Sequence, residues 1–439
     1  MSAAGQAQRR RETAPPYRVA AGEGVDAGAS ALRHALVRSL SWVSVARAIS
    51  GLGAIVRYVV FARLLTPFDF GVVGAASFFE VLFQTVANPN FERALVAETD
   101  AIEPYLDTVW VTMLAQGAIV ALALAVLARP LAAVFRIEGS HRVFVLVAPI
   151  ALLIALKSPA STGRIYRGLD FRISAVLNLA EVLASLAGGV AGILVWRDWR
   201  GLVIAMYCGH LARTGLSYGF YPYRPRLRFD PARARRMFAY GRWVTVRSIT
   251  EFVARNLDNL AVGHLLGPRA LGEYQMAFRI GEFPPAELAN GLGMVSFPVV
   301  ARLRTKPRTR DRLFGLMSGV VALFGIAYAT SIFRYGPALI AATVGAQWIG
   351  ALAPLRLLCI YGMFAGFAGI GTSFLDGLGV PAFSLRLTLI SAATLAVLVY
   401  PLTAAAGASG AALAIVISAV APMPWMLKLY VRANEGRKG

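Results

Sequence analysis

Charged residues are scarce in this sequence of 439 residues. Asp, Glu, Lys and Arg together make up 15% of the chain, whereas a typical soluble domain contains about 25%. Hydrophobic residues reach 57%, and the mean hydropathy is +0.61. This composition excludes a soluble globular protein and predicts an integral membrane protein.

Cysteine and histidine are too few and too scattered for a disulfide framework or a metal site. The two cysteines, Cys208 and Cys359, both lie within apolar stretches, and the four histidines lack metal-ligand spacing. The chain also lacks the GxxxxGK(S/T), HExxH and GxSxG motifs, so ATP hydrolysis and the common hydrolase reactions have no visible residues. We therefore expect no cofactor, and the sequence does not identify a coupling ion, H⁺ or Na⁺.

Acidic residues are scarcer than basic residues. The chain contains 23 Asp and Glu against 44 Lys and Arg, and its formal net charge is +21. Binding to nucleic acid would explain such an excess, but most of the cations lie in short loops between apolar stretches. The bias of Lys and Arg toward the cytoplasmic loops of membrane proteins explains that distribution. We therefore expect no nucleic-acid partner.

Apolar stretches of membrane-spanning length recur along the chain. Residues 1–37 come before them and, being rich in Ala, Gly and Arg, indicate a disordered cytoplasmic tail. The rest of the chain predicts about twelve spans, because a bilayer requires roughly 20 apolar residues for each helix. The predicted spans are 39–65, 68–88, 105–128, 142–157, 173–195, 201–220, 239–266, 280–301, 313–333, 349–375, 380–401 and 408–430.

Basic residues cluster in every second loop, as in the segment 221–237 between the sixth and seventh spans and in the segment 302–312 between the eighth and ninth. The alternate loops hold only scattered cations such as Arg129 and Arg269. This asymmetry predicts that both chain termini lie in the cytoplasm. Single cysteines at Pro67 and Thr403 should then react with an impermeant thiol reagent from outside, and one at Arg228 should not.

The two halves of the chain resemble each other. A shift of 201 residues places WVSVAR…FARLLTPFDFGVV on WVTVRS…VGHLLGPRALGEY without a gap, so that Pro67 matches Pro268 and Gly71 matches Gly272. We expect two lobes of six helices related by an axis along the membrane normal. The predicted lobes are 38–220 and 238–431, joined by the linker 221–237 and followed by a tail at 432–439.

The predicted span 239–266 carries charges on one face. At 100° per residue, Arg247, Glu251, Arg255 and Asp258 fall within an arc of about 80°. Each charge at the middle of a membrane helix costs roughly 2.5–3.5 kcal/mol, so this face should contact water or partner charges. Two interpretations stay open: the charges neutralise one another through i,i+4 pairs, or they line a polar cavity that handles a charged cargo.

Five stretches resemble those of a known group of transporters: ARLLTPFDFGVV at 62–73, RIYRGLDFR at 164–172, YRPRLRFD at 223–230, LDNLAVGHLLGPRALGEYQMAFRI at 257–280 and FPVVARLR at 297–304. In these stretches the chain resembles the polysaccharide-biosynthesis transporters of the flippase (Wzx-like) type. That group belongs to the multidrug/oligosaccharidyl-lipid/polysaccharide exporter (MOP) superfamily. The similarity covers nearly the whole chain from about residue 38.

The resemblance implies an all-α, MATE-like fold in which two six-helix lobes surround a central cavity. It implies a transporter, not an enzyme, that moves an undecaprenyl-diphosphate-linked oligosaccharide from the inner to the outer leaflet of the bacterial cytoplasmic membrane by alternating access. Glycosyltransferases and a polymerase of the same pathway would be its partners, in lipopolysaccharide or exopolysaccharide biosynthesis. With the acidic residues of the charged face included, the candidate cavity residues are Arg47, Arg57, Arg247, Glu251, Arg255 and Asp258.

Two other functions stay open at this point. An ion-coupled exporter of small amphipathic molecules would need a dominant acidic residue, which Glu251 or Asp258 could supply. A membrane glycan polymerase or ligase would need a sizeable outer loop for its catalytic groups, but the longest outer connections expected here are the short segments 129–141 and 334–347. The sequence therefore favours the flippase and leaves the glycan and the oligomeric state open.

Overall fold

The computed structural model describes residues 51–97, 102–137, 139–168, 171–221, 223–302, 307–377 and 381–426. The candidate residue Arg47 and both predicted tails lie outside these ranges. The described residues are mostly helical and contain no β-strand. The predicted all-α class is therefore confirmed for this part of the chain.

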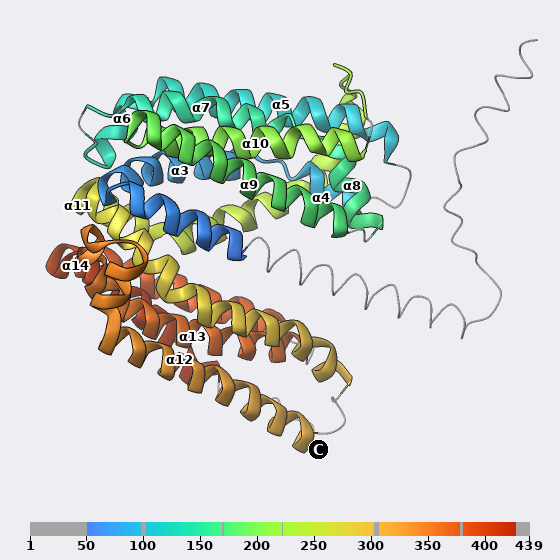
Figure 1. Cartoon of the computed structure of the whole chain (residues 1–439). Helices are drawn as coiled ribbons and strands as arrows, with labels where there is room; N and C mark the ends of the chain where they lie inside the picture. The colour runs from blue at the N-terminus through green and yellow to red at the C-terminus, as the bar shows by residue number, and fades with distance from the viewer. Residues whose placement is uncertain are drawn as a thin grey trace, which may run out of the picture.

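The first half of the chain forms one group of helices, which we call the N-terminal group (Figure 1). Within it, α9 packs along α10, α5 packs along α7, and α3 contacts both α5 and α7. Its members are the helical segment 51–64 and α3 (Pro67–Ala87), α4 (Phe91–Ala97), α5 (Glu103–Val126), α6 (Ala128–Val134), α7 (Arg142–Ala155), α8 (Pro159–Gly168), α9 (Phe171–Trp196) and α10 (Arg200–Phe220).

The second half consists of α11 (Pro231–Arg302), α12 (Pro307–Thr343), the short 3₁₀ helix η1 (Ala346–Ala351), α13 (Leu352–Gly377) and α14 (Pro381–Val420). Two of these elements are each a pair of helices. The chain turns within α11 at Gly267 (φ 82°, ψ −176°) and within α14 at Ala406 and Gly407. We refer to residues 231–266 and 268–302 as the first and second parts of α11.

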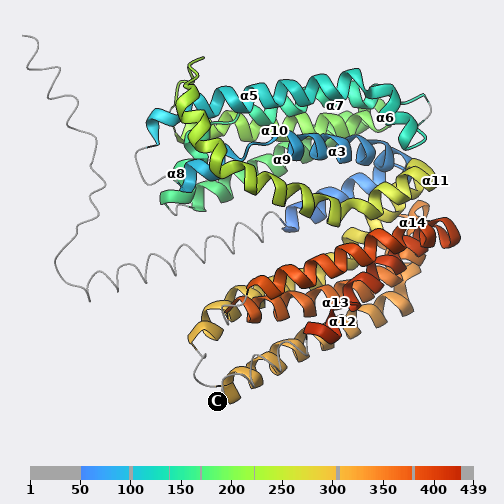
Figure 2. The same ribbon diagram turned by 180° about the vertical axis from the view of Figure 1, so that it is seen from behind.

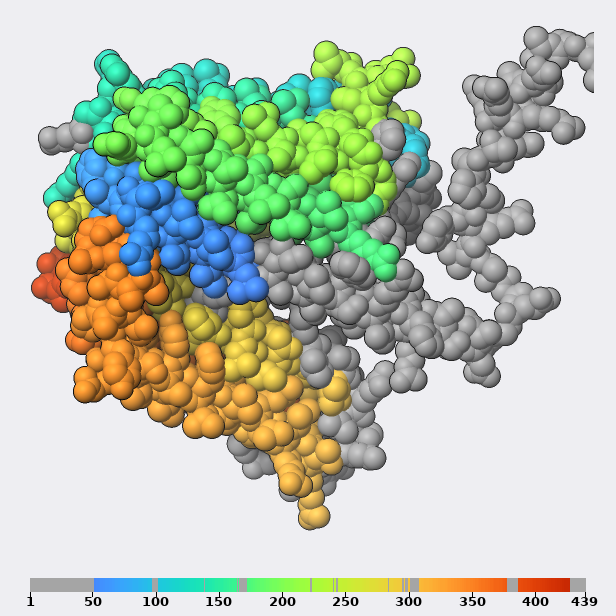
Figure 3. Space-filling model, viewed as in Figure 1, coloured from blue at the N-terminus to red at the C-terminus, as the bar shows by residue number. Residues whose placement is uncertain are grey.

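The two groups of helices meet at one end of the molecule and diverge toward the other (Figures 1 and 2). We call the end that holds Gly267 and η1 the closed end, and the end that holds α4, α8 and the segment 223–230 the open end. In the space-filling view, segment 51–64 (blue) touches α12 (orange) toward the closed end (Figure 3). A hydrogen bond of 2.7 Å from Arg63 Nε to the carbonyl oxygen of Thr343 lies at this contact.

Several helices are long and apolar enough to cross a membrane. By length and composition, six segments of the described chain qualify: Pro67–Ala87, Glu103–Val126, Arg172–Trp196, Arg308–Thr343, Ala346–Asp376 and Arg386–Met426. This finding agrees with a multi-pass membrane protein. The number of twelve spans stays a prediction.

The proline of each repeated block begins a helix. Pro67 is the first residue of α3, after Thr66, whose side chain forms a capping box with Asp69. Pro268 begins the second part of α11, because the left-handed conformation of Gly267 breaks the helix before it. The helix that contains the predicted span 280–301 thus starts at 268 and not at 280, since proline is well tolerated in the first turn of a helix.

The two repeated blocks contact each other at the closed end. A Cβ atom on Gly71 would lie 1.6 Å from the carbonyl oxygen of Pro268, and one on Gly272 would lie 1.9 Å from that of Pro67. Only glycine permits so close an approach of two backbones. The glycines of the two blocks therefore fix where α3 crosses the second part of α11.

The linker is partly helical and is attached to the N-terminal group. The hydroxyl of Tyr223 donates a hydrogen bond to Asp107 of α5, and the amide of Asp230 donates one to Thr108 at 3.2 Å. Asp230 then caps α11, which begins at Pro231. Residues 231–237 of the predicted linker 221–237 thus form the first turns of α11, because proline disfavours the interior of a helix and not its first turn.

Candidate functional site

A cavity of about 760 Å³ lies between the two groups of helices. Its walls come from segment 51–64, α3, α9, α10 and both parts of α11. Apolar residues such as Phe61, Phe70 and Phe78 cover the side next to the N-terminal group. Polar residues gather on α11, where the amide side chains are Asn256, Asn259, Gln275 and Asn290.

The cavity carries more cations than anions among its described lining residues. Arg57, Arg255 and Arg279 line it together with Glu282 and Glu287. Arg57 comes from segment 51–64, and the other four come from α11. The two parts of α11 thus supply most of the charge because the break at Gly267 folds them against each other.

Two of the three arginines are available to a ligand. Arg255 and Arg279 are exposed and have no carboxylate within 4.0 Å among the described residues. Arg279 lies over the ring of Tyr58, 5.5 Å from its centre, which holds the guanidinium at the cavity wall. Arg57 donates a hydrogen bond of 2.9 Å to Ser185. This arrangement suits a ligand with phosphate oxygens, which guanidinium groups bind through paired hydrogen bonds.

The candidate residues from the sequence lie in different places. Arg57 and Arg255 line the cavity. Arg247 and Glu251 do not belong to its described lining and form an exposed ion pair, with 2.8 Å between Arg247 Nε and Glu251 Oε1. The i,i+4 pairing that the sequence allows therefore exists for these two residues, while Arg255 is not paired to Glu251 in this structure.

Asp258 is fully buried behind the cavity wall. Its carboxylate accepts hydrogen bonds of 2.9 Å from the Tyr274 hydroxyl and 3.4 Å from the Asn259 amide. Asn259 lines the cavity and in turn accepts a hydrogen bond of 3.2 Å from Gln275. Asp258 is thus connected to the cavity through Asn259 and is itself shielded from it.

Sequence reasoning missed Arg279, Glu282 and Glu287. All three lie on the second part of α11 and line the cavity. Two of them fall within the predicted span 280–301, and a charge within a membrane span usually marks a functional path. The carboxylates of Glu282 and Glu287 are therefore a signal that the sequence itself contains.

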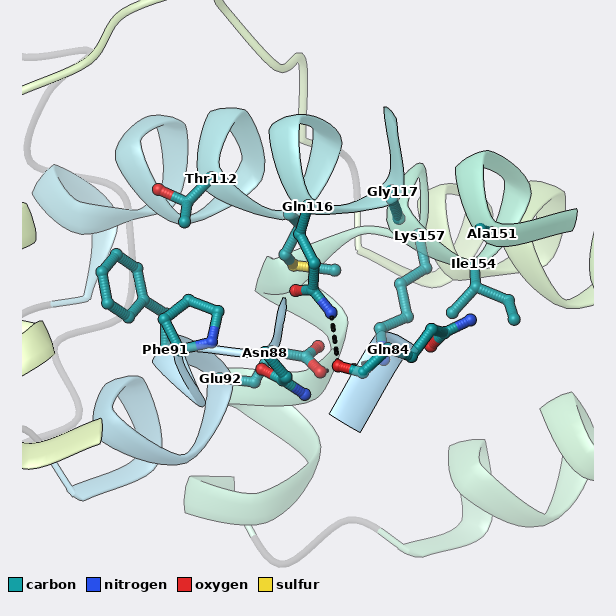
Figure 4. A pocket seen from close by; sticks show the side chains of 13 residues that line it. Gln84, Asn88, Phe91, Glu92, Thr112, Gln116, Gly117, Ala151, Ile154 and Lys157 are labelled. Carbon is teal, nitrogen blue, oxygen red and sulfur yellow. Dashed lines mark hydrogen bonds and ion pairs between the residues drawn. The ribbon is translucent and has the colours of Figure 1, made fainter. Parts of the chain in front are cut away.

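A smaller pocket of about 60 Å³ lies inside the N-terminal group, toward the open end (Figure 4). Its polar groups include the ion pair of Lys157 with Glu92, which are 2.9 Å apart. The Gln116 amide donates a hydrogen bond of 3.3 Å to the carbonyl oxygen of Gln84, drawn as a dashed line in Figure 4. These contacts join α5 to α3, and α4 to the connection between α7 and α8.

An apolar crevice of about 290 Å³ adjoins the cavity. It shares Tyr58 and Arg279 with the cavity and continues between segment 51–64, the second part of α11 and α12. Its other walls are almost entirely aliphatic and include Ile55, Ile280 and Ile332. A charged cavity and an apolar crevice therefore meet at Arg279.

The fold matches that of solved transporters. "Lipid II flippase MurJ, inward closed conformation" aligns with a TM-score of 0.68 and 14% identity, over 88% of this chain and 87% of MurJ. An inward-facing multidrug resistance MATE family transporter of the MOP superfamily aligns with a TM-score of 0.63 and 14% identity, over 91% of this chain and 99% of that structure. The MATE-like fold expected from the sequence is thus confirmed.

Sequence comparison identifies the family. The lipopolysaccharide biosynthesis protein WzxC of Escherichia coli K12 is 22% identical over 342 residues, which cover 76% of this chain and 68% of WzxC. A sequence profile of the family described as polysaccharide biosynthesis protein matches residues 60–353. This match spans more than half of the chain and includes both parts of the α11 wall of the cavity. The chain therefore belongs to the polysaccharide biosynthesis protein family.

Proposed function

We propose that this protein is a flippase that moves an undecaprenyl-diphosphate-linked oligosaccharide from the inner to the outer leaflet of the cytoplasmic membrane by alternating access. The observation that carries the proposal is the pair of exposed arginines Arg255 and Arg279, which have no carboxylate within 4.0 Å among the described residues and line a cavity of about 760 Å³. Guanidinium groups stay charged at physiological pH and match the oxygens of a diphosphate. The family and WzxC, which is named for lipopolysaccharide biosynthesis, support a polysaccharide precursor as cargo.

The apolar crevice supports a cargo that is part lipid. A diphosphate held at Arg279 would leave its polyprenyl chain next to walls such as Ile55 and Ile332, which belong to the crevice. Burying apolar surface there contributes about 25 cal/mol per Å². One binding site thus offers a charged part for the head of the cargo and an apolar part for the start of its tail.

The test uses the purified protein in liposomes that carry the undecaprenyl-diphosphate-linked oligosaccharide, extracted from cells in which the gene is deleted. We expect the protein to make this lipid accessible to a glycan-cleaving enzyme on the opposite leaflet, while empty liposomes do not. We also expect the deleted cells to retain the lipid in the inner leaflet and to lose the corresponding surface glycan. Normal surface glycan in the deleted cells would contradict the proposal.

An ion-coupled exporter of small amphipathic molecules is the second candidate. The observation in its favour is that Glu282 and Glu287 also line the cavity, where a cationic compound would pair with them. Fluorescent cationic compounds in the same liposomes separate the two functions. An exporter would move these compounds in response to a proton or sodium gradient, and a flippase dedicated to lipid-linked glycan would not.

The inner-membrane topology gives a further prediction, with one correction from the structure. Pro67 and Thr403, which the sequence offered as outer labelling positions, are both buried, so cysteines there would fail to react for steric reasons. Arg269 is exposed at the closed end, and Arg228 is exposed at the open end. In intact cells, a cysteine at Arg269 should react with an impermeant thiol reagent, and one at Arg228 should not.

The background for this experiment is a variant in which Cys208 and Cys359 are replaced by serine, since both are free thiols. Permeabilised cells provide the control, because both introduced cysteines should react there. Labelling at Arg228 but not at Arg269 in intact cells would show that the protein lies in the membrane in the orientation opposite to the proposed one.

A further inference from the structure

A second polar pocket lies at the open end, between the end of α3, α4 and the first part of α11. Its volume is about 210 Å³, well above the roughly 10–15 Å³ that a single water molecule needs. All of its described lining residues have polar side chains: Thr85, Asn88, Asn90, Glu92, Arg93 and Ser248. The central cavity, in contrast, is lined in large part by aromatic and aliphatic residues.

The turn that forms one wall of this pocket is rigid. Asn90 has a positive φ of 54°, which is uncommon outside glycine, and its amide donates a hydrogen bond of 2.7 Å to Asn88 Oδ1. Thr245 of α11 accepts a hydrogen bond from Asn90 Nδ2 at 3.0 Å and donates one of 2.6 Å to the Asn88 carbonyl. A Cβ atom on Gly241 would lie 1.8 Å from the Pro89 carbonyl oxygen. The turn is therefore held against α11 before any ligand arrives.

Several polar groups of the pocket remain available to a ligand. Among the described residues, the Asn88 amide NH₂, the Ser248 hydroxyl and the Arg93 guanidinium donate no hydrogen bond to another residue. The Glu92 carboxylate is held in place by Lys157 at 2.9 Å and can still accept. Sugar hydroxyls both donate and accept hydrogen bonds, so these available donors beside a fixed acceptor match a saccharide.

The pocket lies beyond the central cavity, on the side of the open end. Val81 and Phe252 line the cavity, and Thr85 and Ser248 lie four residues further along the same two helices. Four residues correspond to about 6 Å along a helix. We propose that this pocket binds the saccharide of the lipid-linked cargo while the arginines of the cavity hold its diphosphate. This inference rests on the proposed function and adds a site that distinguishes one glycan from another.

Two substitutions test the proposal and keep the hydrogen bonds that hold the turn at Asn88–Asn90 against α11. Asn88→Asp keeps an oxygen that can accept from the Asn90 amide but removes the NH₂ donor, and Ser248→Ala removes the hydroxyl. Ser331→Ala is the matched control, because that hydroxyl is exposed on α12 and bonds only to its own helix, at the Ala327 carbonyl. Binding is measured with the purified full-length protein and two probes: undecaprenyl diphosphate, and the lipid-linked oligosaccharide from the deleted cells.

Each pocket variant should bind the oligosaccharide probe roughly two- to tenfold more weakly, because one hydrogen bond is lost, and should bind undecaprenyl diphosphate as the wild type does. Equal weakening for both probes, or no weakening for either, would overturn the saccharide pocket. So would a wild type that binds both probes equally, although the proposed function would then stand. A wild type that binds neither probe would reject the proposed function itself.

Discussion

Replacing Arg255 or Arg279 by alanine should abolish export of the surface glycan while the protein remains in the membrane. Both guanidinium groups line the cavity without a carboxylate partner within 4.0 Å among the described residues. Each would make hydrogen bonds to a charged phosphate, which contribute about 1.5–3 kcal/mol. We therefore expect each substitution to weaken binding of undecaprenyl diphosphate by roughly 10- to 150-fold. Lysine at either position should restore only part of the affinity, because an ammonium group lacks the forked donors of arginine.

Arg247→Ala is the matched control, since Arg247 lies on the same helix as Arg255 but forms an exposed ion pair with Glu251 outside the described cavity lining. Exposed pairs of this kind contribute about 0.3–0.5 kcal/mol, so export should stay close to normal. If Arg247→Ala abolishes export and Arg255→Ala does not, the diphosphate binds nearer the open end. If the double substitution of Arg255 and Glu251 exports normally, Arg255 does not bind the cargo.

Replacing Gly71 by alanine should destabilise the protein, whereas replacing Gly319 by alanine should stabilise it. Gly319, on α12, has open space where a Cβ would be placed, so Gly319→Ala should stabilise the helix by up to about 1 kcal/mol. At Gly71 the added Cβ would lie 1.6 Å from the Pro268 carbonyl oxygen, and backbone on both sides must move. Overpacking of this kind costs about 1–3 kcal/mol.

Thermal unfolding of the purified variants measures this contrast. The melting temperature should fall for Gly71→Ala and stay level or rise for Gly319→Ala. Export should fall for Gly71→Ala as well, because the closed end cannot form its contact. An unchanged melting temperature for Gly71→Ala would mean that the two blocks are not in contact in the membrane.

Much of the fold could be predicted because the length of the apolar stretches and the internal repeat indicate the same architecture. Apolar stretches of the required length predict membrane helices, and the repeated blocks around Pro67 and Pro268 predict two related halves. The sequence could not show that the blocks touch each other, since that depends on the packing of α3 on α11. It also could not show that the linker is attached to Asp107 and Thr108, which lie far away along the chain.

The sequence predicts which face of the helix carries the charged residues, but not which of those residues reach the cavity. Arg247 and Arg255 share one face of the helix, yet they are eight residues apart, which is about 12 Å along the axis. The cavity reaches Arg255 and leaves Arg247 out of its described lining. Arg279 was missed because its position depends on the break at Gly267, which turns the second part of α11 back against the first.

The contact between the two blocks also bears on how such a chain could arise. Gly71 meets Pro268 and Gly272 meets Pro67, so equivalent residues exchange partners across the closed end. This reciprocal pattern is the signature of an isologous interface, as found between identical subunits related by a two-fold axis. A half-length ancestor could have paired with its own copy through this surface, and gene fusion would then have kept the interface inside one chain. Once fused, each half was free to acquire its own charges, as Arg57 and Asp258 show at positions 201 residues apart.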